Sequence, residues 1–248
     1  MRIGVIGCGT IARAAVEGIV LDGHNITVSE RNTEHASFLA ETYENVQIAD
    51  NQGVVDASDV LFLGLMAEVA PDVLGPLTFR TSQVAISFMA GATLEEADAL
   101  IQPARATAIM MPFPGIAAGG TPIMMYGDTG IVADIFGNRN SIFPVRDPDE
   151  MAAYLCAQAV LSPVALMVSD AADWLGDRVS DKSQGEAFLR MLVASNLSTT
   201  ACGPLIEALN TPGGYNQRLR LHMQTQGFTT ALKSGLTGML PTAANGSR

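Results

Sequence analysis

Three small residues, Gly7, Gly9 and Ala12, form the pattern GxGxxA near the start of the chain. They follow the short apolar run 3–6 and precede a segment with helical spacing. In that context the first glycine allows a tight turn, and the second lets a pyrophosphate approach the backbone. The small third residue lets helix and strand pack closely. The pattern predicts a dinucleotide-binding loop, although an ordinary glycine turn of an α/β protein would have the same residues.

Two charged residues, Glu30 and Arg31, come about 20 residues after the glycines, at the end of the second apolar run. A carboxylate at Glu30 would bind the ribose diol of NAD and repel the 2′-phosphate of NADP, whereas Arg31 would pair with that phosphate. A solvated turn explains both residues without a ligand. We expect Arg31 to prevail, so NADP(H) is the predicted cofactor and NAD(H) stays open.

Short β-branched runs alternate with longer helical segments up to about residue 146. This alternation is typical of a parallel sheet covered by helices, so we predict an α/β fold with a Rossmann-type doubly wound parallel sheet. The expected strands are 3–6, 25–29, 46–48, 60–63, 83–87 and 106–110, with two weaker edge strands at 123–126 and 141–145. The expected helices are 11–21, 33–43, 69–74 and 94–100.

The pattern changes after residue 146. Asp147, Pro148 and Glu150 combine a helix cap, a first-turn proline and a capping-box acid. The following residues have helical character, with breaks expected at Pro163, at 203–204 and at 211–214, and none of them alternates with period two. We therefore predict a dinucleotide-binding domain over 1–146, an all-α C-terminal domain for substrate binding and dimerisation over 147–240, and a flexible tail over 241–248.

Composition limits the classes of protein that this chain can belong to. The 248 residues include 14 basic and 25 acidic side chains, a net charge of −11, and 48% are hydrophobic. No segment is basic enough to predict nucleic-acid binding. Cys8, Cys156 and Cys202 are far apart, which favours a reducing, cytoplasmic location. The histidines are scattered, so no metal site is predicted.

Residues 151–168 form an uncharged stretch of 18 residues, the lower limit for a membrane span. Gln158, Ser162 and Pro163 interrupt it, so we interpret it as a buried helix rather than a membrane segment. Such an apolar helix needs a cover, and we expect partner helices in a homodimer or higher homo-oligomer.

Several segments, in the same order along the chain, resemble pyrroline-5-carboxylate reductases. They are RIGVIGCGTIARA at 2–14, AlaAspAsn at 49–51, IleSerPheMetAlaGly at 86–91, MetProPhePro at 111–114, ThrProGlyGly at 211–214 and GlnGlyPheThrThrAlaLeu at 226–232. The resemblance implies a Rossmann domain that binds NADP(H) and a helical domain that pairs two subunits. It also implies hydride transfer to the ring C=N of a pyrroline carboxylate, the proline-forming step of proline biosynthesis.

The resemblance also implies functional residues. Asn216 aligns with a threonine thought to contact the substrate imine nitrogen, and Tyr215 and Ser162 are further catalytic candidates. A helix-entry pair without a ligand explains Tyr215 and Asn216 equally well. The residues expected to contact the cofactor are Gly7, Gly9, Thr10, Ile11, Ala12, Glu30, Arg31, Asn51, Leu65, Met66, Ala90, Gly91 and Pro112.

The departures from the family pattern fall on the substrate side. Phe113 and Pro114 replace an AsnThrPro segment, Met66 and Ala67 replace a LysPro pair, and a SerGlySerGlyPro turn is reduced to Ser162 and Pro163. We predict an NAD(P)H-dependent reductase of a cyclic imine such as pyrroline-5-carboxylate.

Two alternatives to this prediction stay open. One is an NAD(P)-binding regulatory protein without turnover. The other is a related reductase that acts on a deazaflavin or a β-hydroxy acid, for which Lys182 is the candidate lysine. The active site is expected between the carboxyl edge of the sheet and the helical domain, with 111–115 and 211–216 as its walls.

Overall fold

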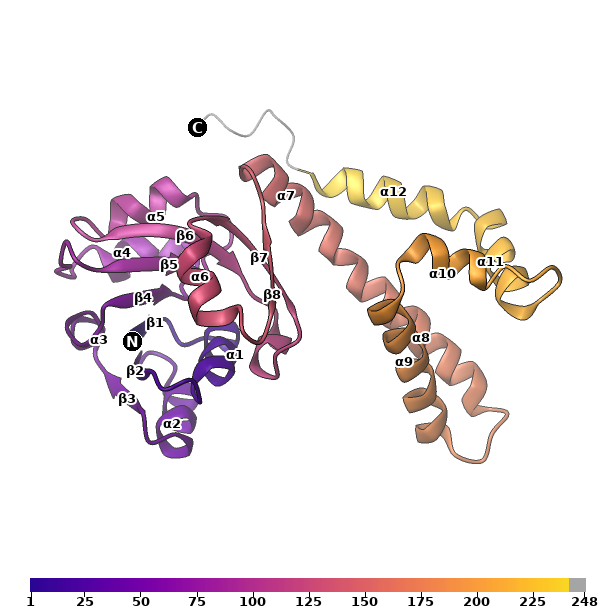
Figure 1. The fold of residues 1–248 in the computed structure, drawn as a ribbon, viewed down its shortest axis with the longest axis horizontal. Coiled ribbons are helices and arrows are strands. Elements are labelled where there is room, and N and C mark those ends of the chain that lie inside the picture. Colours follow the sequence, from indigo (N-terminus) through magenta and orange to yellow (C-terminus); the bar gives the residue numbers. More distant parts are fainter. Residues whose placement is uncertain (241–248) are drawn as a thin grey trace. The chain divides into compact units, whose positions relative to one another are not determined.

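The computed structural model describes residues 1–240, and the predicted tail at 241–248 lies outside the described residues. The chain divides into two compact units, Met1–Met151 and Ala152–Arg248, which are described one at a time (Figure 1).

The first unit is built on one eight-stranded sheet with the order β3-β2-β1-β4-β5-β6-β7-β8. The strands from β3 to β6 pair in parallel, which confirms the doubly wound sheet. The strands are β1 (Arg2–Ile6), β2 (Asn25–Ser29), β3 (Val46–Ala49), β4 (Val60–Leu63), β5 (Val84–Ser87), β6 (Arg105–Met111), β7 (Pro122–Gly127) and β8 (Ser141–Pro144).

The sheet is not parallel at one edge, where the sequence predicted two strands but not their direction. Strand β7 runs antiparallel to β6, and β8 then runs parallel to β7. Only residues 112–121, which include the 3₁₀ helix η2 (Pro114–Ala117), connect β6 to β7. A parallel crossover needs roughly a dozen residues or more to return to the start of the sheet, so this connection reverses the strand instead.

Helices cover both faces of the sheet, because side chains alternate along each strand. Ile3 and Val5 of β1 pack in one core cluster, whereas Ile6 packs in the other. The first face carries α1 (Thr10–Ile19), α2 (Thr33–Thr42) and α6 (Thr129–Phe136), and the opposite face carries α3 (Asn51–Ala57), α4 (Ala70–Leu74) and α5 (Leu94–Leu100) (Figure 1).

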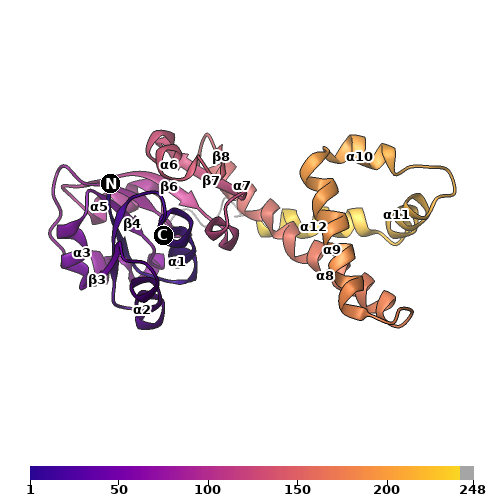
Figure 2. The ribbon, with the colours of Figure 1, turned by 60° about the horizontal axis from the view of Figure 1, so that its bottom comes forward.

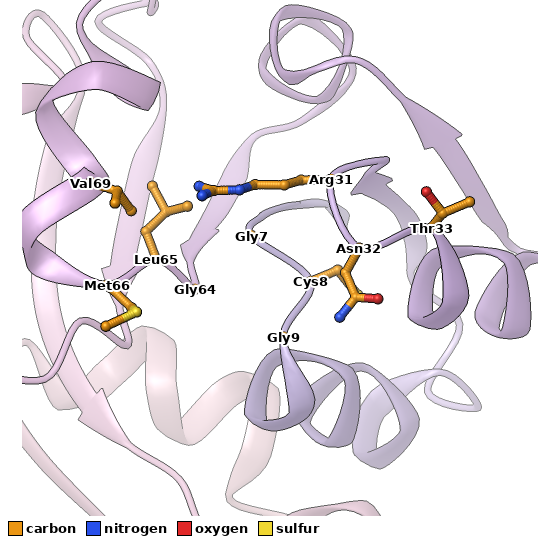
Figure 3. Close-up of a pocket in the computed structure, with 10 residues that line it drawn as sticks. All are labelled: Gly7, Cys8, Gly9, Arg31, Asn32, Thr33, Gly64, Leu65, Met66 and Val69. Atoms are coloured by element: carbon orange, nitrogen blue, oxygen red, sulfur yellow. The ribbon is translucent and has the colours of Figure 1, made fainter.

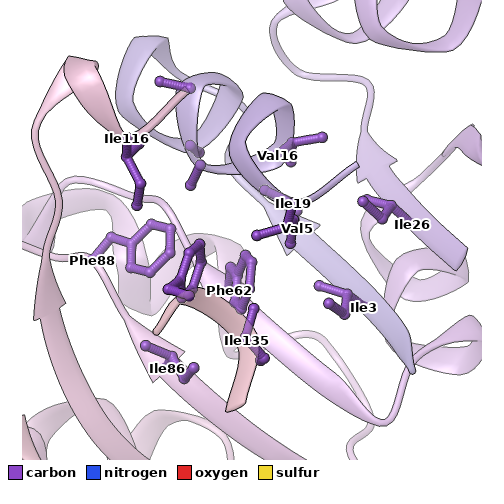
Figure 4. Packing of buried hydrophobic residues seen from close by; sticks show 14 of the residues in the cluster. Ile3, Val5, Val16, Ile19, Ile26, Phe62, Ile86, Phe88, Ile116 and Ile135 are labelled. Carbon is purple, nitrogen blue, oxygen red and sulfur yellow. The ribbon is translucent and has the colours of Figure 1, made fainter. Parts of the chain in front are cut away.

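Three phenylalanines pack together in the first cluster, and Figure 4 labels Phe62 and Phe88 among them. The ring of Phe62 on β4 lies 5.1 Å from that of Phe88 and 5.7 Å from that of Phe136 on α6, centroid to centroid. Ile116 of η2 is buried in the same cluster, and a Cβ atom at Gly18 would lie 2.5 Å from its carbonyl oxygen. The loop after β6 is thereby packed against α1.

Helix α3 is not among the predicted helices. It has seven residues, and Gly53 weakens its helical pattern. Asp50 starts it, because the Asp50 carboxylate accepts a hydrogen bond from the Gly53 amide at 2.7 Å. On the same face, the 3₁₀ helix η1 (Ala67–Val69) precedes α4.

The helical unit follows α7 (Pro148–Ala157), which begins in the first unit. Its elements are η3 (Gln158–Val160), α8 (Leu161–Gly176), α9 (Lys182–Thr199), α10 (Cys202–Ala208), α11 (Tyr215–Thr225) and α12 (Phe228–Met239). The break expected at 211–214 separates α10 from α11.

The break expected at 203–204 comes slightly earlier, because α9 ends at Thr199 and α10 begins at Cys202. The break expected at Pro163 is wrong. Pro163 is the third residue of α8, and the chain before it is already helical through α7 and η3. The α-helical turns change to the 3₁₀ helix η3 just before α8, but the helical path continues.

Very little of the helical unit is buried. Helices α8 and α9 lie side by side (Figures 1 and 2), and Gly185 of α9 packs against Leu175 of α8. Among residues 152–240, only Ala172, Gly176 and Gly185 are buried. Large apolar side chains are exposed on several helices, including Leu161 at 65%, Trp174 at 62% and Met191 at 71%.

The span Pro148–Gly176 has 29 residues and a mean hydropathy of 1.8 in its most apolar window. Within residues 1–240 it is the one helix whose length and composition would allow it to cross a membrane.

Candidate functional site

A pocket of about 420 Å³ opens at the carboxyl end of the sheet in the first unit (Figure 3). Its lining follows the ends of β1, β2 and β4, where ligands of doubly wound sheets bind. The lining residues are Gly7, Cys8 and Gly9 after β1, Arg31, Asn32 and Thr33 after β2, and Gly64, Leu65, Met66 and Val69 after β4.

Gly7 is required by the protein itself. Its φ is +89°, a left-handed conformation that favours glycine, and a Cβ atom there would lie 2.5 Å from the carbonyl oxygen of Gly64. The Gly64 amide in turn donates to the Ile6 carbonyl at 2.8 Å. A Cβ atom at Gly64 would lie 2.9 Å from that of Ala12. Glycine and alanine are therefore needed where the loops after β1 and β4 cross.

Gly9 is different, because no protein atom requires it. Its φ is −74°, which any residue can adopt, and a Cβ atom there would have no protein atom within 4 Å. It caps the N-terminus of α1, whose first amides receive no side-chain cap. Free amides beside open space are what a pyrophosphate needs, so these residues fit a dinucleotide.

A buried hydroxyl holds the glycine loop in place. The Gly7 amide donates to Ser29 Oγ at 2.9 Å, and Ser29 is fully buried at the end of β2. The sequence gives no signal for this role, because the two residues lie 22 positions apart. Ser29 thereby links the loop after β1 to the strand whose end carries Arg31.

The Cys8 thiol is not a nucleophile in this site. Cys8 is 1% exposed, and burial raises the pKa of its thiol to about 11. The reactive form of a cysteine is the thiolate, so the neutral Cys8 side chain serves as apolar packing behind the loop.

Five of the predicted cofactor residues line the pocket, namely Gly7, Gly9, Arg31, Leu65 and Met66. Figure 3 shows the Arg31 side chain extending across the pocket toward Leu65 and Val69. The other predicted cofactor residues lie outside the lining. Thr10, Ile11 and Ala12 form the first turn of α1, Glu30 is exposed after β2, Asn51 begins α3, Ala90 and Gly91 follow β5, and Pro112 follows β6.

Sequence reasoning missed half of the lining: Cys8, Asn32, Thr33, Gly64 and Val69. All of them lie in the loops, or at the starts of the helices, that follow strands whose ends were predicted, and this position is the signal that would have found them.

The predicted catalytic residues lie in the helical unit. Tyr215 and Asn216 begin α11 and are exposed, and Ser162 is the second residue of α8. The turn before α11 is held from within the unit. Gln217 accepts from the Gly213 amide at 2.8 Å and donates to Asn210 Oδ1 at 3.1 Å. The segment that carries Asn216 therefore has a defined conformation.

Lys182, the candidate for β-hydroxy acid chemistry, is exposed at the start of α9. Its ammonium nitrogen lies 3.7 Å from Asp177 Oδ1, and both side chains are about three-quarters exposed. Within residues 1–240, no group of three histidine, cysteine or acidic side chains is placed to hold a metal ion.

Comparisons with known proteins agree with this geometry. A family model described as NADP oxidoreductase coenzyme F420-dependent matches residues 2–91, the part that contains the pocket. The pyrroline-5-carboxylate reductase of Corynebacterium melassecola is 33% identical over 100 residues, which cover 37% of either chain. The chain thus matches little more than a third of the length of this curated relative.

Solved structures resemble the whole chain. The 1-pyrroline-5-carboxylate reductase of Streptococcus pyogenes has a TM-score of 0.81 at 22% identity, covering 97% of this chain and 96% of the other. The pyrroline carboxylate reductase of Plasmodium falciparum, solved with NADP bound, has a TM-score of 0.78 at 14% identity, covering 97% and 95%. The resemblance to pyrroline-5-carboxylate reductases is confirmed, and the chain has their fold.

The two glycines of the loop give a direct test of the pocket. We expect Gly9→Ala to keep the melting temperature of the parent and to weaken NADPH binding about ten-fold or more, since its methyl group would occupy the pyrophosphate space. Gly7→Ala should instead lower the melting temperature, because of its positive φ and the Gly64 carbonyl. Thermal unfolding and fluorescence titration with NADPH measure both effects. A folded Gly9→Ala variant with parental affinity would contradict this assignment.

Proposed function

We propose that the protein is an NADPH-dependent reductase that transfers hydride to the C=N bond of a cyclic imine such as pyrroline-5-carboxylate. The observation that carries the proposal is the open space beside Gly9, at the uncapped start of α1, with Arg31 on the facing wall. The family model supports an NADP-dependent oxidoreductase, and the fold of pyrroline carboxylate reductases supports an imine as the acceptor. The cysteines are unpaired, which supports the expected cytoplasmic location.

Imine reduction requires little acid–base chemistry from the protein. Bound NADPH supplies the hydride, and the protein positions the acceptor carbon and delivers one proton to the nitrogen. The amides at the start of α1 and the Gly7–Gly9 loop would hold the pyrophosphate, and Arg31 would pair with the 2′-phosphate. Asn216 would orient the imine nitrogen through its side-chain amide, with the Tyr215 hydroxyl as a proton donor. Ser162 is the alternative polar group.

The assay is oxidation of NADPH, followed by absorbance, with pyrroline-5-carboxylate and a panel of other cyclic imines. The panel also includes keto acids, an oxidised deazaflavin and a β-hydroxy acid run in the NADP-reducing direction. Turnover of an imine supports the proposal. Tight NADPH binding without turnover of any acceptor would instead favour a nucleotide-binding regulatory protein, and absence of NADPH binding would overturn the proposal.

Arg31 should determine the preference for NADPH. A charge-assisted contact with the 2′-phosphate is worth about 1.5–3 kcal/mol, so Arg31→Ala should weaken NADPH binding roughly ten-fold to a hundred-fold. Its effect on NADH should be much smaller. Glu30→Gln is the matched variant, and it should leave NADPH binding equal or tighter because it removes a nearby negative charge. If the parent protein bound NADH as tightly as NADPH, the role proposed for Arg31 would be contradicted.

Asn216 should affect chemistry and not cofactor affinity. Loss of one oriented hydrogen bond in the transition state costs about 1–2 kcal/mol, so Asn216→Ala should lower kcat/KM about ten-fold. The Kd of NADPH should stay the same. Asn216→Thr, which restores the residue of the resembled family, should raise activity on pyrroline-5-carboxylate. An unchanged kcat/KM in Asn216→Ala would remove Asn216 from the mechanism and direct attention to Tyr215 and Ser162.

We also propose that a second copy of the chain covers the helical unit. With three buried residues among 152–240, this unit has too little core to hold its own helices together. The exposed apolar residues are spread over α8, α9 and α11, and Asp170 and Asp173 lie among those on α8. A protein partner can offer polar groups to these carboxylates beside its apolar surface, whereas the lipid interior cannot.

Sedimentation should therefore show a particle of at least twice the chain mass of 26.0 kDa at micromolar concentration. Met191→Glu should dissociate it, because the charge would be buried without a partner. Leu21→Glu is the control, since Leu21 is 80% exposed on the first unit. A stable monomer of the parent protein would reject the dimer.

A further inference from the structure

His35 connects two walls of the pocket. It lies in the first turn of α2, and its ring nitrogen Nδ1 lies 3.0 Å from the carbonyl oxygen of Cys8, in the glycine loop. The same nitrogen lies 3.1 Å from the side-chain amide nitrogen of Asn32. Asn32 and Cys8 both line the pocket, on the β2 and β1 sides respectively (Figure 3).

These two contacts need opposite states of Nδ1. A carbonyl oxygen only accepts, so the bond to Cys8 forms when Nδ1 carries a hydrogen. An amide nitrogen only donates, so the bond from Asn32 forms when Nδ1 has a free lone pair. His35 therefore bonds to one of them at a time.

The orientation of Asn32 is set by a third bond. Its side-chain oxygen accepts from the backbone amide of His35 at 3.3 Å and caps α2. A flip of the Asn32 amide would lose this cap, so its nitrogen keeps facing His35 or another acceptor in the pocket.

We propose that His35 is a positioning residue that couples the phosphate-reading side of the cofactor site to the glycine loop. The Asn32 amide has two hydrogens, one of which faces Nδ1 of His35. When an anionic group of the cofactor accepts that hydrogen, Nδ1 of His35 is free to carry the ring hydrogen. The hydrogen passes from Nε2 to Nδ1 through solvent, so the ring keeps its charge. Nδ1 then donates to the Cys8 carbonyl and holds the loop against the pyrophosphate.

The coupling favours a phosphorylated cofactor. The 2′-phosphate of NADPH is a charged acceptor for Asn32, whereas the ribose of NADH offers only hydroxyl groups. Because coupling between two sites is reciprocal, a tighter loop also raises the affinity for the phosphate. This inference rests on the proposed function, since it concerns the same cofactor.

Variants at His35 should fold. The α2 cap uses the backbone amide of residue 35, which every replacement other than proline keeps. The bond from the Gly7 amide to Ser29 Oγ still holds the other end of the loop. His35→Leu removes both ring contacts, whereas the side-chain amide of His35→Asn places a permanent donor near the position of Nδ1.

The experiment measures the Kd of NADPH and of NADH for the full-length protein by fluorescence titration, with melting temperatures alongside. We expect His35→Leu to weaken NADPH binding about ten-fold and NADH binding by no more than about three-fold. His35→Asn should keep the Kd of NADPH within about two-fold of the parent value. It should also reduce the ratio of the NADH Kd to the NADPH Kd. Glu41→Gln, exposed near the end of the same helix, should leave both constants unchanged.

Unchanged NADPH affinity in His35→Leu would overturn the inference while leaving the proposed function in place. Equal losses for both cofactors, not rescued by His35→Asn, would also overturn it, because they would show a purely structural role. If the parent protein binds neither cofactor, the proposed function fails and this inference fails with it.

Discussion

The close crossing of two backbone loops, at Gly7 and Gly64, is the constraint on which the pocket depends. Each glycine occupies the space where a side chain of the other would stand, and the Gly64 amide is hydrogen-bonded to the Ile6 carbonyl. Because the loops after β1 and β4 meet this closely, α1 can begin directly after Gly9 with its first amides at the carboxyl edge of the sheet. A side chain at either glycine would push the two strands apart.

The charge of the pocket lining is opposite in sign to the net charge of the whole chain. The protein has a net charge of −11, yet the first turn of α1 carries no acidic residue, and Arg31 is the charged residue in the pocket lining. By contrast, α5 has Glu95 and Glu96 in its first turn, and a capping box between Thr93 and Glu96 satisfies amides at its N-terminus. An uncapped helix start in an acidic protein leaves its partial positive charge available for an anion.

The helical unit buries far fewer side chains than the first unit. Its helices bury small residues such as Gly185, which packs against Leu175, and leave large ones such as Trp174 and Met191 exposed. The first unit has two complete cores, one on each face of the sheet. Hydrophobic burial therefore holds the first unit together within one chain, whereas the second unit buries few side chains within one chain.

The sequence by itself determined most strands and helices of the first unit and the glycine loop after β1. Strands β2 and β4 and helix α5 have the predicted bounds, because buried parallel strands are continuous apolar runs and a capping box marks a helix start. Helix α3 and the antiparallel direction of β7 were not predicted, since the Asp50 cap and the ten-residue connection before β7 override the local pattern. The roles of Asn216, Tyr215 and Ser162 stay predictions.

Only the tertiary structure decided which side chains meet around the pocket. Ser29 and His35 reach the glycine loop across 22 and 27 positions, and Gly64 approaches Gly7 from a different strand. The local spacing of apolar residues predicts where each strand lies in the sequence but not which strands pair with it. Contacts between loops at the carboxyl ends of β1, β2 and β4 arise only when parallel pairing brings distant segments to one edge.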